Sequence, residues 1–424
     1  MIKSIFLTIF ILVCYFVNAQ NIFPGAEGFG SDSRGAYAGD TLPIIIKVTN
    51  LNDGGPGSLR SAIYKNVPRI VVFEVSGVIE LKRTLRVFNP YLFIAGQTAP
   101  YPGITLKNYS LGISSHDILI QGLKIRPGIA SGKQIDGINI ADDSTKLYNI
   151  VVDHCSISWA TDENIGILNG GNGITISNCI ISEALTYKNH SCGLLAMNTG
   201  QISIIKNLFV HNADRNPLVR GDSQEALIAN NLIYNSDTHA LYFGSRGPKG
   251  LPLKATALNN FYLPGIQNRN GYIISISSEI HVGSRLFLKG NKTHNLPSGD
   301  QWGMRQIHNP GNRAIATFDK PIKMPQLSII AVSQLQNHLF DNCGAHAGNR
   351  DVIDQRIISE ISNKSGKRIR NPYSVGGWPG ESSERKLTLM NDPHGDVDEN
   401  GFTNIEEWLN QLLFKSDKLS TVTE

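Results

Sequence analysis

One short pattern recurs along the first two thirds of the chain: an apolar pair, a polar or asparagine residue, and a second apolar run. Imperfect repeats of 20 to 50 residues built from β-rich units are typical of solenoids, because each coil buries its apolar face only against neighbouring coils. Aligning one position of each copy gives spacings of 32, 24, 29, 24 and 29 residues; the aligned positions are Gly122, His154, Asn178, Asn207, Asn231 and Asn260. The repeat predicts an all-β chain folded as a right-handed, single-stranded parallel β-helix.

Two details of the repeat refine this prediction. Asparagines at one register position can stack as a hydrogen-bonded ladder along a turn of the solenoid. Cys155 and Cys179 fall at the same position of adjacent coils, about 4.8 Å apart by strand spacing. A disulfide is conceivable there, but we favour two stacked apolar side chains. A β-sandwich or barrel is disfavoured, because it would need hairpin turns every 8–12 residues and these are not seen.

The first 19 residues are typical of a secretory signal peptide. Lys3 precedes an apolar run at 5–17, and Val17, Asn18 and Ala19 form a small-residue exit. We therefore expect an exported protein, extracellular or periplasmic, without a membrane span; a lipid anchor at Cys14 is a weaker alternative. The mild positive charge is diffuse and predicts no nucleic-acid partner.

The segment 151–220 concentrates acidic residues on successive strand-like copies. Asp153 and Asp162 flank one coil, Glu163 follows directly, and Glu183 ends the next copy. Carboxylates from neighbouring coils can converge on one rim, which is the arrangement that Ca²⁺ requires. The alternative is that these acids are ordinary loop residues or caps.

Basic residues follow the acids. Arg215 and Arg220 lie five apart, and they point to one side only if the extended chain bends, which Pro217 allows. Lys188 and His190 lie in the intervening segment and could reach the same groove. A salt-bridged loop is the alternative.

The chain changes character near residue 330, where helix-like charged sequence begins. We expect a β-helix domain over 20–330 and an extension over 331–424 that wraps back on it. The segment 396–407 fits the EF-hand loop, with Gly401 at the turn position and oxygen-bearing residues at the ligand positions: Asp396, Asp398, Asn400, Asn404 and Glu407. It predicts a structural Ca²⁺ site; the alternative is a solvated acidic turn before a helix.

Several longer segments resemble one family. They are FPGAEGFG (23–30), VTNLNDGGPGSLRSAI (48–63), RIVVFEVSGVI (69–79), IAGQTAPYPGI (94–104), DHCSISWATDE (153–163), RNPLVR (215–220) and GAHAGNRDVIDQRI (344–357). Together they resemble the secreted pectate lyases of polysaccharide lyase family 1, over nearly the whole mature chain. That family has the right-handed parallel β-helix fold, in agreement with the repeat.

The resemblance implies roles for single residues. Asp153 resembles a calcium-binding Asp and Asp162 a second calcium ligand; Arg215 resembles the arginine that acts as base, and Arg220 the one that binds the substrate carboxylate. Two positions depart from the family. Gly166 stands where another calcium-binding Asp is usual, so Glu163 or Glu183 is the substitute. The substrate-binding lysine has no clear match, and we favour Lys188 over His190 because its charge is fixed.

The implied activity is calcium-assisted β-elimination of de-esterified, 4-linked α-galacturonan, which gives 4,5-unsaturated oligogalacturonides. Carboxylates retained at Asp153 and Asp162 favour pectate over methylated pectin, and pectin lyase activity is the nearest alternative. A polygalacturonase-type hydrolase would use two carboxylates and water, but it leaves Arg215 and Arg220 without a role. A non-catalytic binding β-helix would have more uniform repeats. A monomer is expected.

Overall fold

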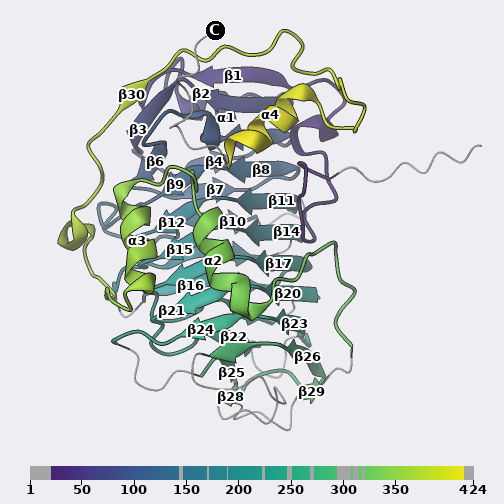
Figure 1. Cartoon of the computed structure of the whole chain (residues 1–424), viewed down its shortest axis with the longest axis vertical. Helices are drawn as coiled ribbons and strands as arrows, with labels where there is room; N and C mark the ends of the chain where they lie inside the picture. Colours follow the sequence, from purple (N-terminus) through teal and green to yellow (C-terminus); the bar gives the residue numbers. More distant parts are fainter. Residues whose placement is uncertain are drawn as a thin grey trace, which may run out of the picture.

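The computed structural model describes residues 21–142, 147–169, 171–188, 190–221, 225–245, 251–267, 272–293, 307–308, 315–317 and 320–414. The predicted signal peptide and Cys14 lie outside the described residues. Three sheets run along the molecule, and the central coils contribute one strand to each sheet (Figure 1).

The first sheet contains the strands β1 (Ile44–Val48), β2 (Arg69–Phe73), β5 (Leu92–Ala95), β8 (Ile118–Gln121), β11 (Tyr148–Asp153), β14 (Asn172–Ser177), β17 (Gln201–Ile205), β20 (Glu225–Ala229), β23 (Lys254–Leu258), β26 (Ser284–Lys289) and β29 (Ile315–Thr317). The second sheet contains β4 (Leu85–Val87), β7 (Leu111–Ile113), β10 (Ile138–Ala141), β13 (Glu163–Leu168), β16 (Cys192–Met197), β19 (Leu218–Arg220), β22 (Leu241–Gly244), β25 (Ile274–Ile276) and β28 (Ile307–His308).

The third sheet contains β3 (Val75–Glu80), β6 (Ile104–Lys107), β9 (Leu123–Ile125), β12 (Ser156–Ser158), β15 (Ile180–Ser182), β18 (Leu208–Val210), β21 (Leu232–Tyr234), β24 (Phe261–Leu263), β27 (Lys292–Thr293) and β30 (Ser383–Glu384). Within the described part of the chain, β30 pairs with β3 in antiparallel orientation and the other strand pairs are parallel. The predicted parallel β-helix is confirmed.

The core is built from columns of aliphatic side chains that repeat at one register position. One column in the first sheet is fully buried and consists of Ile94, Ile120, Val152, Ile176, Ile204 and Ile228. β-Branched residues suit these positions, because their stiff side chains pack well on a pleated surface. The apolar runs of the sequence repeat are therefore the interior of the solenoid.

An asparagine ladder runs along one turn, but its register differs from our expectation. The Nδ2 of Asn207 donates to Asn231 Oδ1, that of Asn231 to Asn260 Oδ1 and that of Asn260 to Asn291 Oδ1, at 3.0, 2.9 and 2.8 Å. The backbone N–H of Cys179 also donates to Asn207 Oδ1 at 2.9 Å, so Cys179, not Asn178, holds the ladder position of its coil.

The spacings read from paired strands are 32, 24, 28, 24 and 29, so the predicted 29 between Asn178 and Asn207 was one residue too long. The cause is that asparagine suits two adjacent positions of this turn. Asn178, Asn230 and Asn259 precede the ladder with φ of 50°, 55° and 48°, in the left-handed region that asparagine tolerates.

The cysteines of the described chain are free and buried. Cys155 and Cys179 lie on neighbouring coils, and each thiol donates to a backbone carbonyl, at 3.3 Å to Asp153 and 3.0 Å to Ser177. The stacked pair that we favoured is therefore confirmed over the disulfide.

The C-terminal segment lies along the outside of the solenoid (Figure 1). It contains α2 (Val332–Asn342), α3 (Val352–Ser362), η3 (Pro372–Val375) and α4 (Asn404–Leu412); the shorter helices η1 (Gly35–Ala38), α1 (Leu59–Ile63) and η2 (Gly96–Thr98) belong to the first coils. Leu335, Leu339 and Ile357 pack on the outer face of the third sheet. Buried Arg126 of the β-helix binds Asp351 and Asp354 at 2.6 and 2.7 Å.

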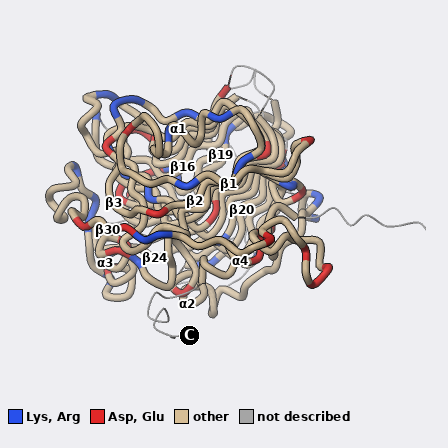
Figure 2. The backbone as a smooth tube through the Cα atoms, turned by 90° about the horizontal axis from the view of Figure 1, so that it is seen from above, with Lys and Arg blue, Asp and Glu red and all other residues tan. Residues whose placement is uncertain are grey.

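Charge on the molecule is mixed. Seen from above in Figure 2, Lys and Arg positions are interspersed with Asp and Glu positions along the backbone. No helix within the described ranges has both the length and the apolar character that a membrane crossing needs.

Candidate functional site

An acidic cluster lies where strands of the second sheet begin. Asp136, Asp162 and Glu163 each place a carboxylate oxygen within 4.8 Å of the others. Ile138 of β10 pairs with Ile165 of β13, so position 136 is level with position 163 one coil later. The backbone N–H of Glu163 donates to Asp136 Oδ1 at 3.2 Å, and Asn139 Nδ2 donates to Asp136 Oδ2 at 2.7 Å.

Gly166 faces the same cluster. A Cβ added to Gly166 would come within 2.3 Å of Asp136 Oδ2. The space that an acidic side chain at 166 would need is therefore filled by the carboxylate of Asp136 from the preceding coil. The cluster keeps a third acid although the position expected to supply it is glycine.

The crowding of these carboxylates has an electrostatic cost. Burial, opposed by the Asn139 hydrogen bond and reinforced by the charge of Asp162, raises the pKa of Asp136. Burial and then the charge of Asp136 raise the pKa of Glu163 to about 8, although Arg215 acts in the opposite direction. A bound cation would relieve this repulsion, so the donor set fits a hard metal ion such as Ca²⁺.

Arg215 joins the cluster to a groove on the second sheet. Its guanidinium is ion-paired with Glu163, and its φ of 58° bends the chain just before β19. Burial lowers the pKa of Arg215, but the facing Cys192, Glu163 and Asp214 outweigh it and leave that pKa raised.

Arg220, at the end of β19, lines the same pocket as Arg215, with a volume of about 200 Å³. Its Nε donates to the carbonyl of Ser245 at 3.2 Å. Tyr242, Ser277 and Glu279 complete much of the lining. The expected convergence of Arg215 and Arg220 on one side is therefore present.

Lys188 and His190 lie on a tight turn beside the cluster, where Tyr187 and His190 form an antiparallel bridge. His190 Nδ1 lies 2.9 Å from Asp162 Oδ1, although the angles are not those of a hydrogen bond. Lys188 is exposed, and its Nζ lies 5.4 Å from the ring centroid of Tyr187. The structure thus places His190 against the acids and Lys188 at the surface.

In the coil that follows Glu163, Cys192 occupies the register position that Asp136 and Glu163 hold in the two preceding coils. Cys192 pairs with Glu163 and forms a bridge with Asp214. Asp136, Glu163, Cys192 and Asp214 therefore form a column along four coils, which we call the rim column. Burial raises the pKa of the Cys192 thiol to about 12.

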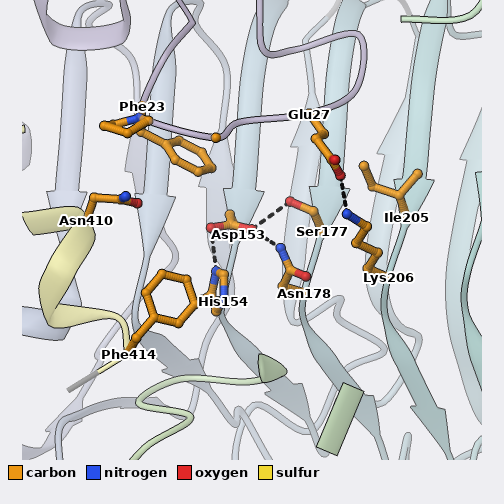
Figure 3. Close-up of a pocket in the computed structure, with 12 residues that line it drawn as sticks. Phe23, Glu27, Asp153, His154, Ser177, Asn178, Ile205, Lys206, Asn410 and Phe414 are labelled. Carbon is orange, nitrogen blue, oxygen red and sulfur yellow. Dashed lines mark hydrogen bonds and ion pairs between the residues drawn. The ribbon is translucent and has the colours of Figure 1, made fainter. Parts of the chain in front are cut away.

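Asp153 does not belong to this cluster. It ends β11 of the first sheet, is fully buried, and lines a separate cavity of about 190 Å³ (Figure 3). Its carboxylate accepts from four side chains, at 2.6–2.9 Å: Gln121, His154, Ser177 and Asn178. The expected grouping of Asp153 with Asp162 is not found, because Asp153 ends a strand of the first sheet whereas Asp162 directly precedes β13 of the second sheet.

Glu183 is also engaged elsewhere. It is fully buried and binds Arg356 of α3 at 2.8 Å, and Trp159 Nε1 donates to it at 2.9 Å. The structure therefore gives Glu183 a role in holding the C-terminal segment to the solenoid, in place of the expected position in the acidic cluster.

The segment 396–407 has its ligand-position side chains gathered. Asp396 accepts from the backbone N–H of Asn400 and Gly401 at 3.1 and 2.8 Å, and Gly401 has φ of 92°. Asn400 Nδ2 donates to Asp398 and Glu407 at 2.9 and 2.6 Å. Asn404 instead donates to the carbonyl of Asp392 and begins α4.

The sequence prediction missed Asp136 and Cys192. Our repeat alignment used the first and third sheets, so it never compared the starts of the second-sheet strands. The available signal was the spacing of 27 between Asp136 and Glu163 and of 29 between Glu163 and Cys192, both close to one coil. An alignment of all three strands per coil would have found the rim column.

No protein-family model matches the chain. It is 35% identical over 378 residues to a protein of Emericella nidulans named probable pectate lyase C, covering 86% of this chain and 82% of the relative. A protein of the same name from Aspergillus terreus is 30% identical, with coverage of 95% and 96%.

Solved structures agree in fold. A Bacillus subtilis pectate lyase matches with a TM-score of 0.51 and 14% identity, covering 79% of this chain and all of that chain. A pectate lyase bound to a hexasaccharide matches with a TM-score of 0.53 at 14% identity, covering 78% and 99%. The sequence identity to the fungal proteins, over most of both chains, establishes that this chain belongs to the pectate lyase family.

Proposed function

We propose that this chain is a secreted pectate lyase that cleaves de-esterified, 4-linked α-galacturonan by calcium-assisted β-elimination. The observation that carries the proposal is the placement of an acidic cluster beside two arginines on one sheet. Asp136, Asp162 and Glu163 stand on one side of Arg215, and Arg220 lines the groove beyond it. A polyuronate needs both a cation and fixed positive charge to approach a surface that carries acids.

Asp136, Asp162 and Glu163 would hold the Ca²⁺, in place of the expected set that included Asp153 and Glu183. Their oxygen donors suit a hard cation, and the pKa values of Asp136 and Glu163 are raised by burial and by the neighbouring negative charges, a repulsion that a cation relieves. When bound, Ca²⁺ would neutralise the uronate carboxylate and make the adjacent C5 proton easier to remove.

Arg220 would bind the uronate carboxylate, because a guanidinium presents paired donors to two oxygens. Arg220 is the last residue of β19, Arg215 lies just before that strand, and both line the groove. Negative charge that develops on the carboxylate during proton removal would be stabilised by this preorganised cation.

Arg215 would take the C5 proton. In the metal-free site Arg215 is firmly protonated, because Glu163, Asp214 and Cys192 hold its pKa up. Arg215 can therefore lose its proton only if a bound cation takes over the negative charge that now faces it. Glu163 allows this, because it contacts Arg215 and also belongs to the acidic cluster. The C4 oxygen would leave and take a proton from water, which gives the 4,5-unsaturated product.

Lys188 or His190 would bind a further carboxylate of the polymer. Lys188 keeps a fixed charge at the exposed turn, whereas His190 is held beside Asp162. The turn therefore offers one exposed cation on the acidic side of the arginine groove.

The deciding experiment incubates the purified mature protein with polygalacturonate, with added calcium or with chelator, and follows the ultraviolet absorbance of unsaturated uronate. Calcium-dependent absorbance is expected. Reducing ends without absorbance would mean hydrolysis and would overturn the proposal. Highly methylated pectin, tested in parallel, separates pectate lyase from pectin lyase activity.

Arg356→Lys serves as the control variant because Arg356 binds Glu183 and Glu360 away from the groove. Arg356→Lys is expected to form the same product as the wild-type protein, with the same dependence on calcium. An Arg215→Lys protein that is equally folded is expected to give almost none.

We also propose that the loop 396–407 binds a second, structural Ca²⁺. The supporting observation is that Asp396, Asp398, Asn400 and Glu407 already gather around one turn at the start of α4. Glu406, next to the last of these, is ion-paired with Arg34 at 3.0 Å, so the loop is attached to the first coils. The mature protein would then be secreted as a monomer whose C-terminal helix is fixed by a metal.

A further inference from the structure

The donor atoms beside Arg215 form a second group, different in kind from the acidic cluster. Glu163, His190 and Cys192 each place one donor atom within 4.8 Å of the other two. The group thus offers a carboxylate oxygen, an imidazole nitrogen and a sulfur. Ca²⁺ does not use sulfur and rarely uses nitrogen, whereas Zn²⁺ and Co²⁺ bind all three.

The local chain geometry brings the three together. Glu163 and Cys192 are register partners on β13 and β16, so their side chains leave adjacent strands at the same level. His190 closes the turn that begins at Tyr187 and lies two residues before Cys192, the first residue of β16; side chains at that spacing share a face where the chain is extended.

An independent observation points to an occupant. His190 Nδ1 is buried and makes no hydrogen bond: Asp162 Oδ1 lies 2.9 Å away but outside hydrogen-bond geometry, and the side chain as a whole is 35% exposed. A buried imidazole nitrogen that makes no hydrogen bond is costly, and a metal ion would give that nitrogen a bond. The partly exposed ring can also make the short adjustment that metal ligands at about 2.0–2.3 Å require.

We propose that Glu163, His190 and Cys192 form a binding site for a thiophilic divalent metal such as Zn²⁺, which overlaps the calcium cluster through Glu163. On binding, a metal–sulfur bond forms and the Cys192 thiol proton passes to solvent. The Glu163–Arg215 ion pair breaks at the same time. No atom is oxidised or reduced. A solvent molecule or substrate oxygen completes the fourth position, as in open zinc sites.

The overlap has a functional consequence. A metal held by Glu163, His190 and Cys192 removes Glu163 from the calcium cluster and from Arg215. Zn²⁺ is therefore an inhibitor that competes with Ca²⁺. In the rim column Cys192 is the sulfur ligand among three carboxylates. The column therefore offers donors for Ca²⁺ at Asp136 and Glu163 and a donor for a thiophilic metal at Cys192.

The test uses chelator-treated full-length mature protein and Co²⁺ as the probe, read by absorption without substrate. The wild-type protein is expected to show a thiolate-to-cobalt charge-transfer band in the near ultraviolet. Cys192→Ala is expected to lack the band and His190→Ala to weaken binding at least about tenfold. Cys343→Ala, which removes another buried free thiol, is the matched control and keeps the band.

Circular dichroism confirms that each variant is folded. A second measurement needs no variant: excess Ca²⁺ should raise the apparent Kd of Co²⁺ for the wild-type protein. Absence of the band in folded wild-type protein, or its persistence in Cys192→Ala, overturns the proposal. A Co²⁺ affinity that Ca²⁺ leaves unchanged overturns the overlap through Glu163.

The inhibition rests on the proposed lyase activity, whereas the cobalt band does not. Zn²⁺ added at fixed Ca²⁺ should reduce wild-type activity, and Cys192→Ala should lose less of its own activity. If the protein binds Co²⁺ through Cys192 but shows no lyase activity, the metal site stands and the proposed function fails.

Discussion

Gly166 and Asp136 are neighbours on adjacent coils, so close that a Cβ at Gly166 would meet Asp136 Oδ2 at 2.3 Å. The third acid of the cluster therefore reaches the site from the preceding coil. We expect Gly166→Asp to weaken Ca²⁺ binding by the acidic cluster, because the new side chain would push the carboxylate of Asp136 out of its place. Calorimetric titration with Ca²⁺ would show lower affinity; tighter binding would mean that the coil adjusts to both acids.

Asp136→Asn distinguishes the acidic cluster from the pocket of Asp153. Loss of one carboxylate should raise the Kd for Ca²⁺ at least about tenfold, that is by about 1.4 kcal/mol. Asp153→Asn should leave that Kd nearly unchanged and lower the melting temperature, because Asp153 accepts four buried hydrogen bonds. The reverse pattern in titration and thermal melting would return Asp153 to the calcium site.

The two arginines should separate kinetically. Arg215→Lys should lower kcat on the order of 10²–10⁴-fold, the range for loss of a proton-transfer group. Arg220→Lys keeps the charge but loses the paired donors, so it should raise KM more than it lowers kcat. Steady-state rates on polygalacturonate give both values, and equal effects on kcat from both variants would contradict separate roles.

Stability without metal should depend on pH through Glu163. The ordinary pKa of 4.5 applies to the unfolded chain, and the folded protein raises the pKa of Glu163 to about 8. Between these values the folded state binds the extra proton, so stability falls as pH rises from about 4.5 to 8. Melting temperatures measured with chelator would show this slope, and Glu163→Gln should flatten it.

Calcium should reverse that trend, because it binds the ionised carboxylate and its affinity rises as Glu163 loses its proton. A calcium-saturated protein whose melting temperature falls with pH as steeply as the chelated protein would contradict a role for Glu163 as ligand.

The asparagine ladder makes a stability prediction. Asn231 Nδ2 donates to Asn260 and to the carbonyl of Ile204, and its Oδ1 accepts from Asn207. Asn231→Ala leaves these buried groups unpaired, at about 1–3 kcal/mol each. Asn342→Ala, whose amide bonds within its own helix, should change the free energy of unfolding by less than about 0.5 kcal/mol. Denaturant unfolding would compare the two.

Calcium removal should also loosen α4. If the loop 396–407 binds Ca²⁺, a hundredfold excess over Kd stabilises the protein by about 2.7 kcal/mol. Trp408 packs against the first coils, so its fluorescence reports release of the helix. Asp398→Ala should reproduce the effect of chelator, whereas Glu399→Ala, outside the ligand positions, should not. No change with chelator would make the loop an ordinary acidic turn.

The parallel β-helix could be predicted because its core needs apolar pairs at each coil, and that need leaves a visible repeat. The ladder register could not, because Asn178 and Asn207 both satisfy local rules and only strand pairing separates them. Arg215 and Arg220 were predicted together because they lie in one short segment. Asp136 was missed because its neighbours in space are a full coil away in the sequence.

Asp153 and Glu183 show a further limit of sequence patterns. Each acid ends a strand copy, as a rim ligand would, yet each is buried and fully bonded to side chains from other segments. A pattern of acids records where charge lies along the chain, but not which sheet of the solenoid carries it.

The C-terminal segment joins the latest residues to the earliest. Arg34 binds Glu406 across 372 positions, β30 pairs with β3, and Gln97 donates to the carbonyl of Leu409. These contacts form only after almost the whole chain is available. The first coils therefore remain uncapped while the chain is being synthesised, and truncation near residue 400 should expose the apolar surface of those coils even though every strand of their sheets is present.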